Sequence, residues 1–128
     1  MSNTINALLI DDDRLNLEVL NRFLTREGIA CTLVQDVKHI CSAIAAPAEI
    51  SLVFLDLEMP RANGYEVLSV LRGALGAAVP IVACTVHVNE IANARQLGFD
   101  GFISKPLDQK RFPEQVRRIL DGESVWES

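Results

Sequence analysis

The residues of this chain that could do chemistry stand at the ends of four hydrophobic segments. Asp11 and Asp12 follow "INALLI", Asp56 ends "ISLVFLD", Thr85 ends "VPIVACT", and Lys105 follows "GFIS". Burying a carboxylate in an apolar setting is costly unless it has a partner. Their repeated placement after apolar segments therefore predicts one shared site that combines three carboxylates, a hydroxyl and an ammonium group.

A site with three carboxylates calls for a cation. Two carboxylates about 4 Å apart repel each other by about 4 kcal/mol at an effective dielectric constant of about 20, and Lys105 offsets only part of this. Mg²⁺ binds one or two carboxylates and leaves room for water and a phosphoryl oxygen, so we expect Mg²⁺ here, with Mn²⁺ able to take its place. Ca²⁺ fits less well because the chain has no DxDxDG loop. Beside such a metal, Asp56 could carry a phosphoryl group as an acyl phosphate whose oxygens meet Thr85 and Lys105.

The elements that must position these residues alternate along the chain. Apolar segments typical of strands cover residues 5–10, 30–35, 50–56, 79–85 and 101–104. Segments with helical periodicity or helix-end signals cover residues 13–28, 37–46, 64–75, 89–98 and 108–122. The alternation predicts an α/β fold, a flavodoxin-like (βα)5 doubly wound parallel sheet with strand order 2-1-3-4-5. The carboxyl ends of its strands form one rim, where ligands bind.

Several residues near the ends of elements have structural interpretations. Asp13 is expected to cap the first helix rather than bind a metal, and Gly28 to end that helix. Asn89 is expected to cap the fourth helix. Gly64 would serve a turn or a close approach of the backbone. Asn16 could touch the site, but it is expected instead to bond within its loop or to lie exposed.

Composition limits the classes of function. The chain has 128 residues, 49% of them hydrophobic, with a net charge of −5. This fits one domain with a real core, and it argues against nonspecific binding to nucleic acid or an anionic membrane. Because no apolar run approaches the ~20 residues of a membrane span and "MSNTINALLI" lacks a signal pattern, we expect a cytoplasmic protein.

The domain is expected to cover residues 1–121, with residues 122–128 as a loose C-terminal tail in which Trp126 has no assigned role. The chain has three cysteines, Cys31, Cys41 and Cys84, and no two of them form a CxxC pair. We expect them to be reduced and mostly buried, because an odd number with this spacing indicates neither a disulfide framework nor a zinc site.

From about residue 5 to residue 121, the chain resembles the receiver domain of two-component response regulators. The segments that carry the resemblance are "LLIDDDRLN", "LVFLDLEMPRANGYEVL", "PIVACT" and "GFDGFISKPL". Their order and spacing together are specific, whereas a DD pair or a KP pair alone would be weak.

The resemblance implies roles for the site residues. Asp56 would be the phospho-acceptor, and Asp11 and Asp12 the acidic pair, with Asp12 the closer metal ligand. Glu58 would offer its backbone carbonyl to the metal. Lys105 would pair with the phosphoryl group, and its peptide bond to Pro106 would be cis.

The resemblance also implies a switch. Thr85 would turn toward the phosphoryl group and vacate space into which Phe102 rotates, which would change the surface of the fourth helix, fifth strand and fifth helix. Phe102 departs mildly from the tyrosine common at this position. Val86 is bulkier than the small residue frequent there and could narrow access to Asp56, while His87 could influence how water reaches the site.

The function expected is therefore that of a stand-alone receiver, which is not a turnover enzyme. It would accept a phosphoryl group from a histidine kinase or a histidine phosphotransfer protein and act on a downstream protein. It would be a monomer or a weak phosphorylation-dependent dimer, with no direct contact to nucleic acid or membrane.

Three alternatives remain open. The chain could be a receiver fragment of a hybrid kinase or of a larger regulator. It could be an aspartate-nucleophile phosphatase, although such enzymes typically carry a D-x-D pair and the residue two positions after Asp56 is Glu58 here. A flavodoxin-type FMN binder would need a hydroxyl- and glycine-rich loop where this chain has "DDDRLN".

Overall fold

The structure is a computed structural model of the whole chain, and it describes residues 5–45, 49–59, 62–86 and 88–127. The strands are β1 Ile5–Ile10, β2 Ile29–Val34, β3 Leu52–Leu55, β4 Glu58–Met59, β5 Ala62–Asn63, β6 Ile81–Thr85, β7 Gly101–Ser104 and β8 Val125–Glu127. The helices are α1 Arg14–Arg26, α2 Ile40–Ile44, α3 Gly64–Leu75, α4 Ile91–Gln96 and α5 Phe112–Leu120, with 3₁₀ turns η1 Val37–His39 and η2 Val88–Glu90.

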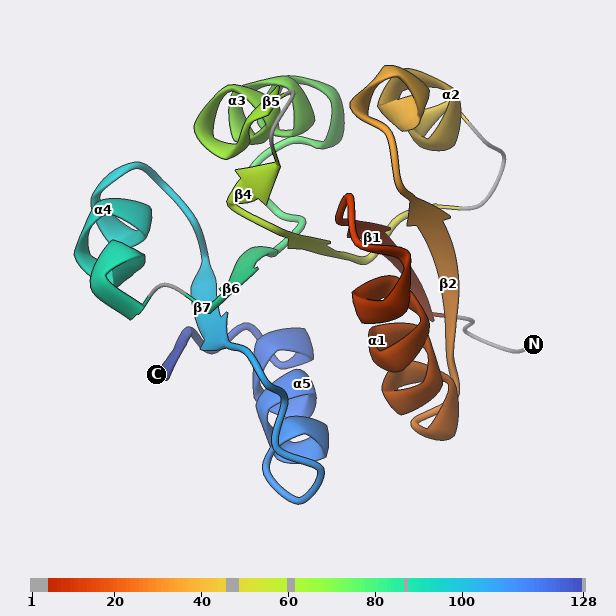
Figure 1. Cartoon of the computed structure of the whole chain (residues 1–128), viewed down its shortest axis with the longest axis vertical. Helices are drawn as coiled ribbons and strands as arrows, with labels where there is room; N and C mark the ends of the chain where they lie inside the picture. Colours follow the sequence, from red (N-terminus) through yellow and green to blue (C-terminus); the bar gives the residue numbers. More distant parts are fainter. Residues whose placement is uncertain (1–4, 46–48, 60–61, 87, 128) are drawn as a thin grey trace.

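The main sheet confirms the predicted fold class. Its order is β2-β1-β3-β6-β7-β8, and every neighbouring pair runs parallel. The first five of these strands reproduce the predicted order 2-1-3-4-5. Helices α1 and α5 cover one face of the sheet, and α2, α3 and α4 cover the other, as Figure 1 shows.

The core consists of two layers because the central strands are apolar on both faces. Along β3, Val53 and Leu55 join the cluster beneath α2, α3 and α4, whereas Leu52 and Phe54 join the cluster beneath α1 and α5. All four side chains are buried. Strands of this kind must lie inside a sheet covered on both sides, which holds the strand ends, and hence the site, in place.

Helix α1 begins and ends where the sequence predicts. The Asp13 carboxylate accepts hydrogen bonds from the backbone N–H groups of Leu15 and Asn16, which are donors without a partner inside the helix. Gly28 follows the helix with φ of 78°, a left-handed conformation that glycine adopts without a steric penalty. The interpretation of Asp13 as a cap is thus confirmed.

Two later helices begin after the predicted residues. The helix expected over 108–122 is α5 alone, because the Asp108 carboxylate accepts the backbone N–H groups of Lys110 and Arg111 and closes a turn there. Pro113 still lies in the first turn of α5. Asn89 is not the cap of α4, since it lies within η2 and Glu90 precedes the helix.

The second predicted helix, residues 37–46, is divided. Asp36 accepts the backbone N–H of Lys38 and caps η1, and α2 follows directly. Residues 46–48 lie outside the described part of the chain.

The expectation of a loose C-terminal tail is wrong for residues 125–127. These residues form β8, which pairs with β7 in a sixth parallel position, with Gly101 opposite Val125. Val125 is completely buried, and Trp126 packs against the core cluster beneath α4. A strand this short has no periodicity to read in sequence; it is specified by the open edge of β7 that it covers.

The cysteines only partly match expectation. All three are free, as expected, but Cys84 is buried, Cys31 is half-buried and Cys41 is exposed, so the expectation of mostly buried thiols fails for Cys41. Among the described residues, no helix has the length and apolar character needed to cross a membrane.

Gly64 and Gly73, both in α3, provide a matched test of the packing under the site. A Cβ atom on Gly64 would lie 3.0 Å from the Cα of Leu57, whereas one on Gly73 would meet nothing within 4 Å. We expect Gly64→Ala to lower the free energy of unfolding by about 1–3 kcal/mol and Gly73→Ala to raise it by about 0.5–1 kcal/mol. Urea unfolding measures both; a Gly64→Ala protein as stable as the wild type would contradict the close approach.

Candidate functional site

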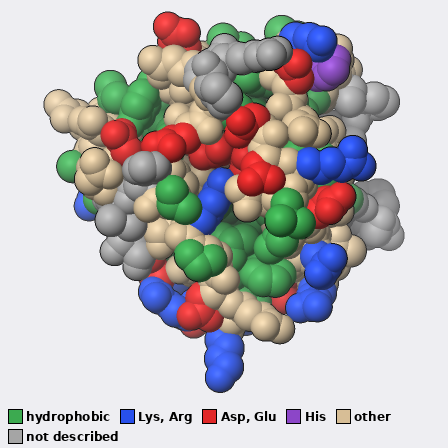
Figure 2. Space-filling model, in the orientation of Figure 1, with side chains coloured by type: hydrophobic (Ala, Val, Ile, Leu, Met, Phe, Trp, Pro, Cys, Tyr) green, Lys and Arg blue, Asp and Glu red, His purple; other side chains and the backbone are tan. Residues whose placement is uncertain are grey.

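The register of the sheet brings two of the predicted carboxylates together. Strand β1 pairs with β3 so that Ile10 lies opposite Leu55, and the next residues, Asp11 and Asp56, lie at the same rim. The Asp56 N–H donates to the Ile10 carbonyl at 2.9 Å. Carboxylate oxygens of Asp11, Asp12 and Asp56 all lie within 4.8 Å of one another. Figure 2 shows acidic side chains gathered near the middle of this face, beside a basic side chain.

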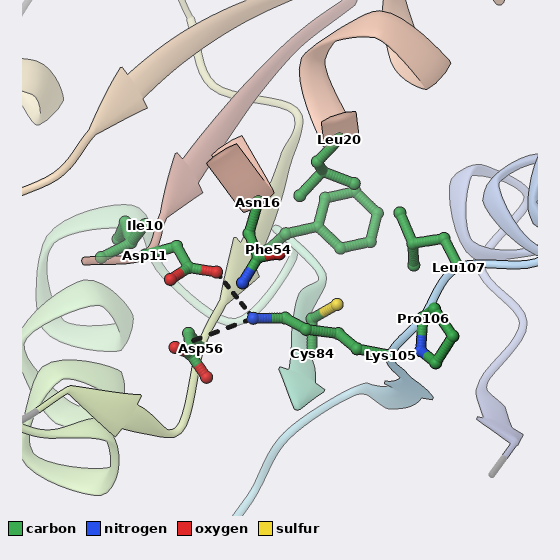
Figure 3. Close-up of a pocket in the computed structure, with 10 residues that line it drawn as sticks. All are labelled: Ile10, Asp11, Asn16, Leu20, Phe54, Asp56, Cys84, Lys105, Pro106 and Leu107. Carbon is green, nitrogen blue, oxygen red and sulfur yellow. Dashed lines mark hydrogen bonds and ion pairs between the residues drawn. The ribbon is translucent and has the colours of Figure 1, made fainter. Parts of the chain in front are cut away.

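Lys105 lies between the two buried carboxylates, as Figure 3 shows. Its Nζ is 2.7 Å from Asp11 Oδ2 and 3.8 Å from Asp56 Oδ2, and its side chain is only 14% exposed. The residue follows β7, and its backbone N–H donates to the Thr85 carbonyl at 2.9 Å. The Lys105–Pro106 peptide bond is cis, as expected. The predicted convergence of Asp11, Asp12, Asp56 and Lys105 is therefore present.

Backbone hydrogen bonds fix the direction of the carboxylates. Asp11 Oδ1 accepts the Asp13 N–H at 2.9 Å, and Asp56 Oδ1 accepts the Glu58 N–H at 3.1 Å. In both residues the other oxygen, Oδ2, is the one that faces Lys105. Hydrogen bonds within the chain thus orient both carboxylates.

Burial and charge shift the titration of the site. The pKa of Asp56 is raised to about 7, chiefly by burial and also by the negative charge of Asp11, while the Glu58 N–H and Lys105 oppose the rise. Burial, followed by the charge of Asp11, raises the pKa of Asp12. For Lys105, burial favours the neutral amine, but the hydrogen bond to Asp11 and the surrounding negative charges outweigh it and raise the pKa.

The donor set fits a hard divalent cation. Its three members are carboxylates, which suit Mg²⁺ or Mn²⁺, whereas zinc sites favour histidine and cysteine. Asp11 and Asp56 are buried, while Asp12 is exposed at the mouth of the site, so a hydrated ion could enter from solvent. The residues present therefore match the expected metal by chemistry.

A small cavity of about 50 Å³ lies behind Lys105. It is lined by Ile10, Asp11, Asn16, Leu20, Phe54, Asp56, Cys84, Lys105, Pro106 and Leu107. Its volume suits one or two water molecules, and it is far below the ~300–1,000 Å³ of typical cofactor pockets. This space cannot hold a flavin, which weighs against an FMN-binding role for it.

Sequence reasoning underrated Asn16, which lines this cavity and is half-buried rather than exposed. Its spacing from Asp12 could have predicted this position, because Asn16 follows Asp12 by four residues, which is about one helical turn. Helix α1 begins at the rim, so its first turn faces the same site. Cys84 was missed as well; it precedes Thr85 in β6 and points its sulfur toward the cavity.

The remaining predicted residues take different positions. Thr85 is buried at the end of β6. Glu58 is exposed, and Val86 is 58% exposed and does not line the cavity. His87 lies outside the described residues. The proposed effects of Val86 and His87 on access stay predictions.

Phe102 differs from the expected starting state of the switch. Its side chain is completely buried in the cluster beneath α4. The expected inward rotation cannot start from this conformation, because the side chain of Phe102 already lies inside the core.

An acidic site at the carboxyl ends of a flavodoxin-like sheet defines a class of protein that the comparisons narrow to one family. The family model of the response regulator receiver domain matches residues 7–117. The chain belongs to this family, which serves signalling.

Individual relatives agree with the family. The response regulator MprA of Mycobacterium tuberculosis (strain H37Rv) is 33% identical over 91% of this chain and 51% of its own length. The osmosensing histidine protein kinase SLN1 of Saccharomyces cerevisiae is 28% identical over 84% of this chain and 9% of its own. The chain thus spans about half of one relative and a small part of the other.

Solved structures share the fold. A two-component response regulator from Clostridium difficile is 27% identical with a TM-score of 0.81, covering 92% of this chain and 97% of that one. A CheY-like receiver domain protein from Methanospirillum hungatei JF-1 has the same TM-score of 0.81 at 20% identity, covering 94% and 96% of the two chains.

The raised pKa of Asp56 makes stability depend on pH when no metal is present. Between pH 3.8 and about 7 the unfolded chain releases a proton that the folded chain retains, so the free energy of unfolding should fall as the pH rises through this window. Asp56→Asn should remove that decline and be about 1–3 kcal/mol more stable than wild type at pH 8 in EDTA.

Urea unfolding across this pH range in EDTA measures the effect. Glu49→Gln, which removes a carboxylate from an exposed position, serves as the control and should keep the wild-type pH profile. If Asp56→Asn were less stable than the wild type at pH 8, the inferred electrostatic repulsion among the carboxylates of the site would be contradicted.

Proposed function

We propose that this receiver accepts a phosphoryl group on Asp56, in a Mg²⁺-dependent reaction, from a phosphorylated histidine of a histidine kinase or a histidine phosphotransfer protein. The observation that carries the proposal is the grouping of Asp11, Asp12 and Asp56 within 4.8 Å with Lys105 Nζ 3.8 Å from Asp56. Phosphoryl transfer asks a protein mainly for positioning and for neutralisation of charge, and this grouping offers both.

The residues proposed to hold the metal are Asp11, Asp12, Asp56 and the backbone carbonyl of Glu58. When bound, Mg²⁺ would neutralise charge on the carboxylates and on the phosphoryl oxygens. Asp12 is the exposed member of the group, so it would meet the incoming hydrated ion first.

In the proposed transfer, an Asp56 carboxylate oxygen attacks the phosphorus atom. A new O–P bond forms as the P–N bond of the phosphohistidine breaks, and the imidazole nitrogen keeps the electron pair. Attack requires the ionised carboxylate, and burial opposes ionisation by raising the pKa of Asp56 to about 7. Positive charge from Lys105 favours the reactive form.

Lys105 and Thr85 are proposed to bind the transferred group. The Lys105 ammonium bonds to Asp11 at 2.7 Å and is close enough to Asp56 to reach a phosphoryl group attached there. Thr85 ends the neighbouring strand, and its backbone carbonyl already holds the Lys105 N–H. Movement of either residue would shift β7, and we propose that the surface formed by α4, β7 and α5 changes with it and is read by a downstream protein.

We propose a switch rather than a turnover enzyme. The stand-alone receiver and the receiver fragment of a hybrid kinase or larger regulator share this mechanism, and the chain matches about half of a longer response regulator and a small part of a histidine kinase. The phosphatase alternative would release phosphate from small esters over many cycles.

Acetyl phosphate tests the acceptor directly. Incubation of the chain with acetyl phosphate and Mg²⁺ should add the mass of one phosphoryl group, which peptide mapping should locate to Asp56. Asp56→Asn should take up none, and EDTA should suppress uptake in the wild type. Modification elsewhere, or continuous release of phosphate from p-nitrophenyl phosphate, would overturn the assignment.

Removal of Asp12 tests the metal site. Asp12→Ala should weaken Mg²⁺ binding, measured by calorimetry, by at least about tenfold, because even outer-shell partners of metal ligands are worth that much. Asp121→Ala removes an exposed aspartate after α5 and should leave the affinity unchanged. Equal affinities of the two variants would remove Asp12 from the proposed ligands.

A further inference from the structure

Strand β8 covers the surface through which the proposed switch acts. It pairs in parallel with the edge of β7, placing Gly101, Phe102 and Ile103 opposite Val125, Trp126 and Glu127. Figure 1 shows the C-terminal end of the chain beside β7, between α4 and α5. The output surface is therefore occupied by a segment of the chain itself.

The side chains of β8 are recognised on both faces of the sheet. Val125 is fully buried in the cluster beneath α1 and α5. Trp126 packs on the opposite face, where the Arg95 guanidinium of α4 lies 5.1 Å from the centre of its ring, a distance at which a cation is attracted to an aromatic face. An apolar residue and an aromatic residue are thus each received by a matching surface.

Glu127 completes the recognition through α5. Its carboxylate accepts hydrogen bonds from Gln115 at 2.6 Å and Arg118 at 3.3 Å, and from Arg111. These donors lower the pKa of Glu127, the Gln115 bond most. Two donors on α5 and a third at its N-cap residue, Arg111, converge on this carboxylate and form a specific site for an acidic side chain.

The edge of β7 is also shaped for a closely packed strand. A Cβ atom on Gly101 would lie 2.9 Å from the Val125 carbonyl oxygen, nearer than a real Cβ contact allows. Glycine at this position is therefore what lets the neighbouring backbone approach.

We infer that the α4–β7–α5 surface docks an extended peptide segment of apolar, aromatic and acidic residues by strand addition, and that β8 is the resident occupant that a partner's segment displaces. The inference rests on the proposed function, since that partner is its downstream protein. Strand addition onto an open edge is a recurring mode of peptide recognition. The occupant shows which chemistry the surface accepts, and the arginines on α4 and α5 complement an acidic partner.

Displacement of β8 does not require the rest of the fold to open. The strand has three residues and lies at the end of the sheet, and short edge elements open at lower free energy than the core. Gly122, with φ of 89°, stands between α5 and the strand and allows the chain to change direction there.

Trp126 is the one tryptophan of the chain, so its fluorescence reports on β8 in the full-length protein. The probe is the peptide ESVFE, which is residues 123–127 with Phe replacing Trp. Added to the wild type, ESVFE should shift Trp126 emission to the red in a saturable manner, whereas ESVFK should not. No shift at any concentration of ESVFE would overturn the inference.

Three variants locate the docking. Glu127→Lys places a cation against Arg111 and Arg118; Trp126 should be exposed, and binding of fluorescein-labelled ESVFE, measured by anisotropy, should tighten at least tenfold, because the resident no longer competes. Gly101→Ala should expose Trp126 without tightening the peptide, because the added methyl blocks either strand. Glu114→Lys, on the exposed side of α5, should change neither readout.

Peptide that binds Gly101→Ala as tightly as Glu127→Lys would overturn docking on β7. Equal binding to the wild type and Glu127→Lys would show that β8 is no competitor and would overturn the inference too. Circular dichroism checks the fold of each variant, and the wild-type titration stands independently of them. Phosphorylation of Asp56 by acetyl phosphate is measured in the same proteins, so failure of the proposed function and failure of the docking surface are distinguished.

Discussion

The constraint on which the rest depends is the forced neighbourhood of carboxylates at the ends of β1 and β3. Backbone pairing of Ile10 with Leu55 places Asp11 and Asp56 side by side, and both are buried. They cannot separate without a break in the register of the central sheet. Lys105 relieves part of the repulsion, but a buried ion pair repays little more than its own desolvation. The site therefore stays short of positive charge, and this shortage is what makes it receptive to a cation.

Strand β7 joins the chemistry to the surface. Lys105, just beyond the end of the strand, reaches Asp11 and Asp56. Within the strand, Phe102 packs in the core beneath α4, and on its outer edge the strand carries β8. In the proposed switch, a change in charge at Asp56 would therefore act on the strand that also presents the inferred partner surface. Because Phe102 is already buried, that change would be expressed by the strand and its edge as a whole rather than by inward rotation of one ring.

The sequence predicted the strand order and the shared rim of the sheet, because these depend on periodicity and apolar character. The strands that directly precede Asp11 and Asp56, and the strand that ends in Thr85, are apolar on both faces. Their place inside the sheet and their shared rim therefore follow directly. What failed depends on contacts that sequence does not display. The start of α5 is set by the Asp108 turn, and β8 exists because Gly101 leaves room for it. Cavity residues such as Asn16 depend on the direction in which a helix leaves its strand.

The run of three aspartates shows how one residue type takes three roles within the same turn of chain. Asp11 continues the line of β1 into the buried rim and binds Lys105. Asp12 faces solvent at the mouth of the site, and Asp13 turns back to cap α1. Each charge meets a different partner: an ammonium group, solvent or an incoming cation, and the positive end of a helix. The repulsion expected from the sequence therefore acts mainly among Asp11, Asp12 and Asp56, where a bound cation would reduce it. Asp13 instead caps and stabilises α1, the helix that begins beside the site.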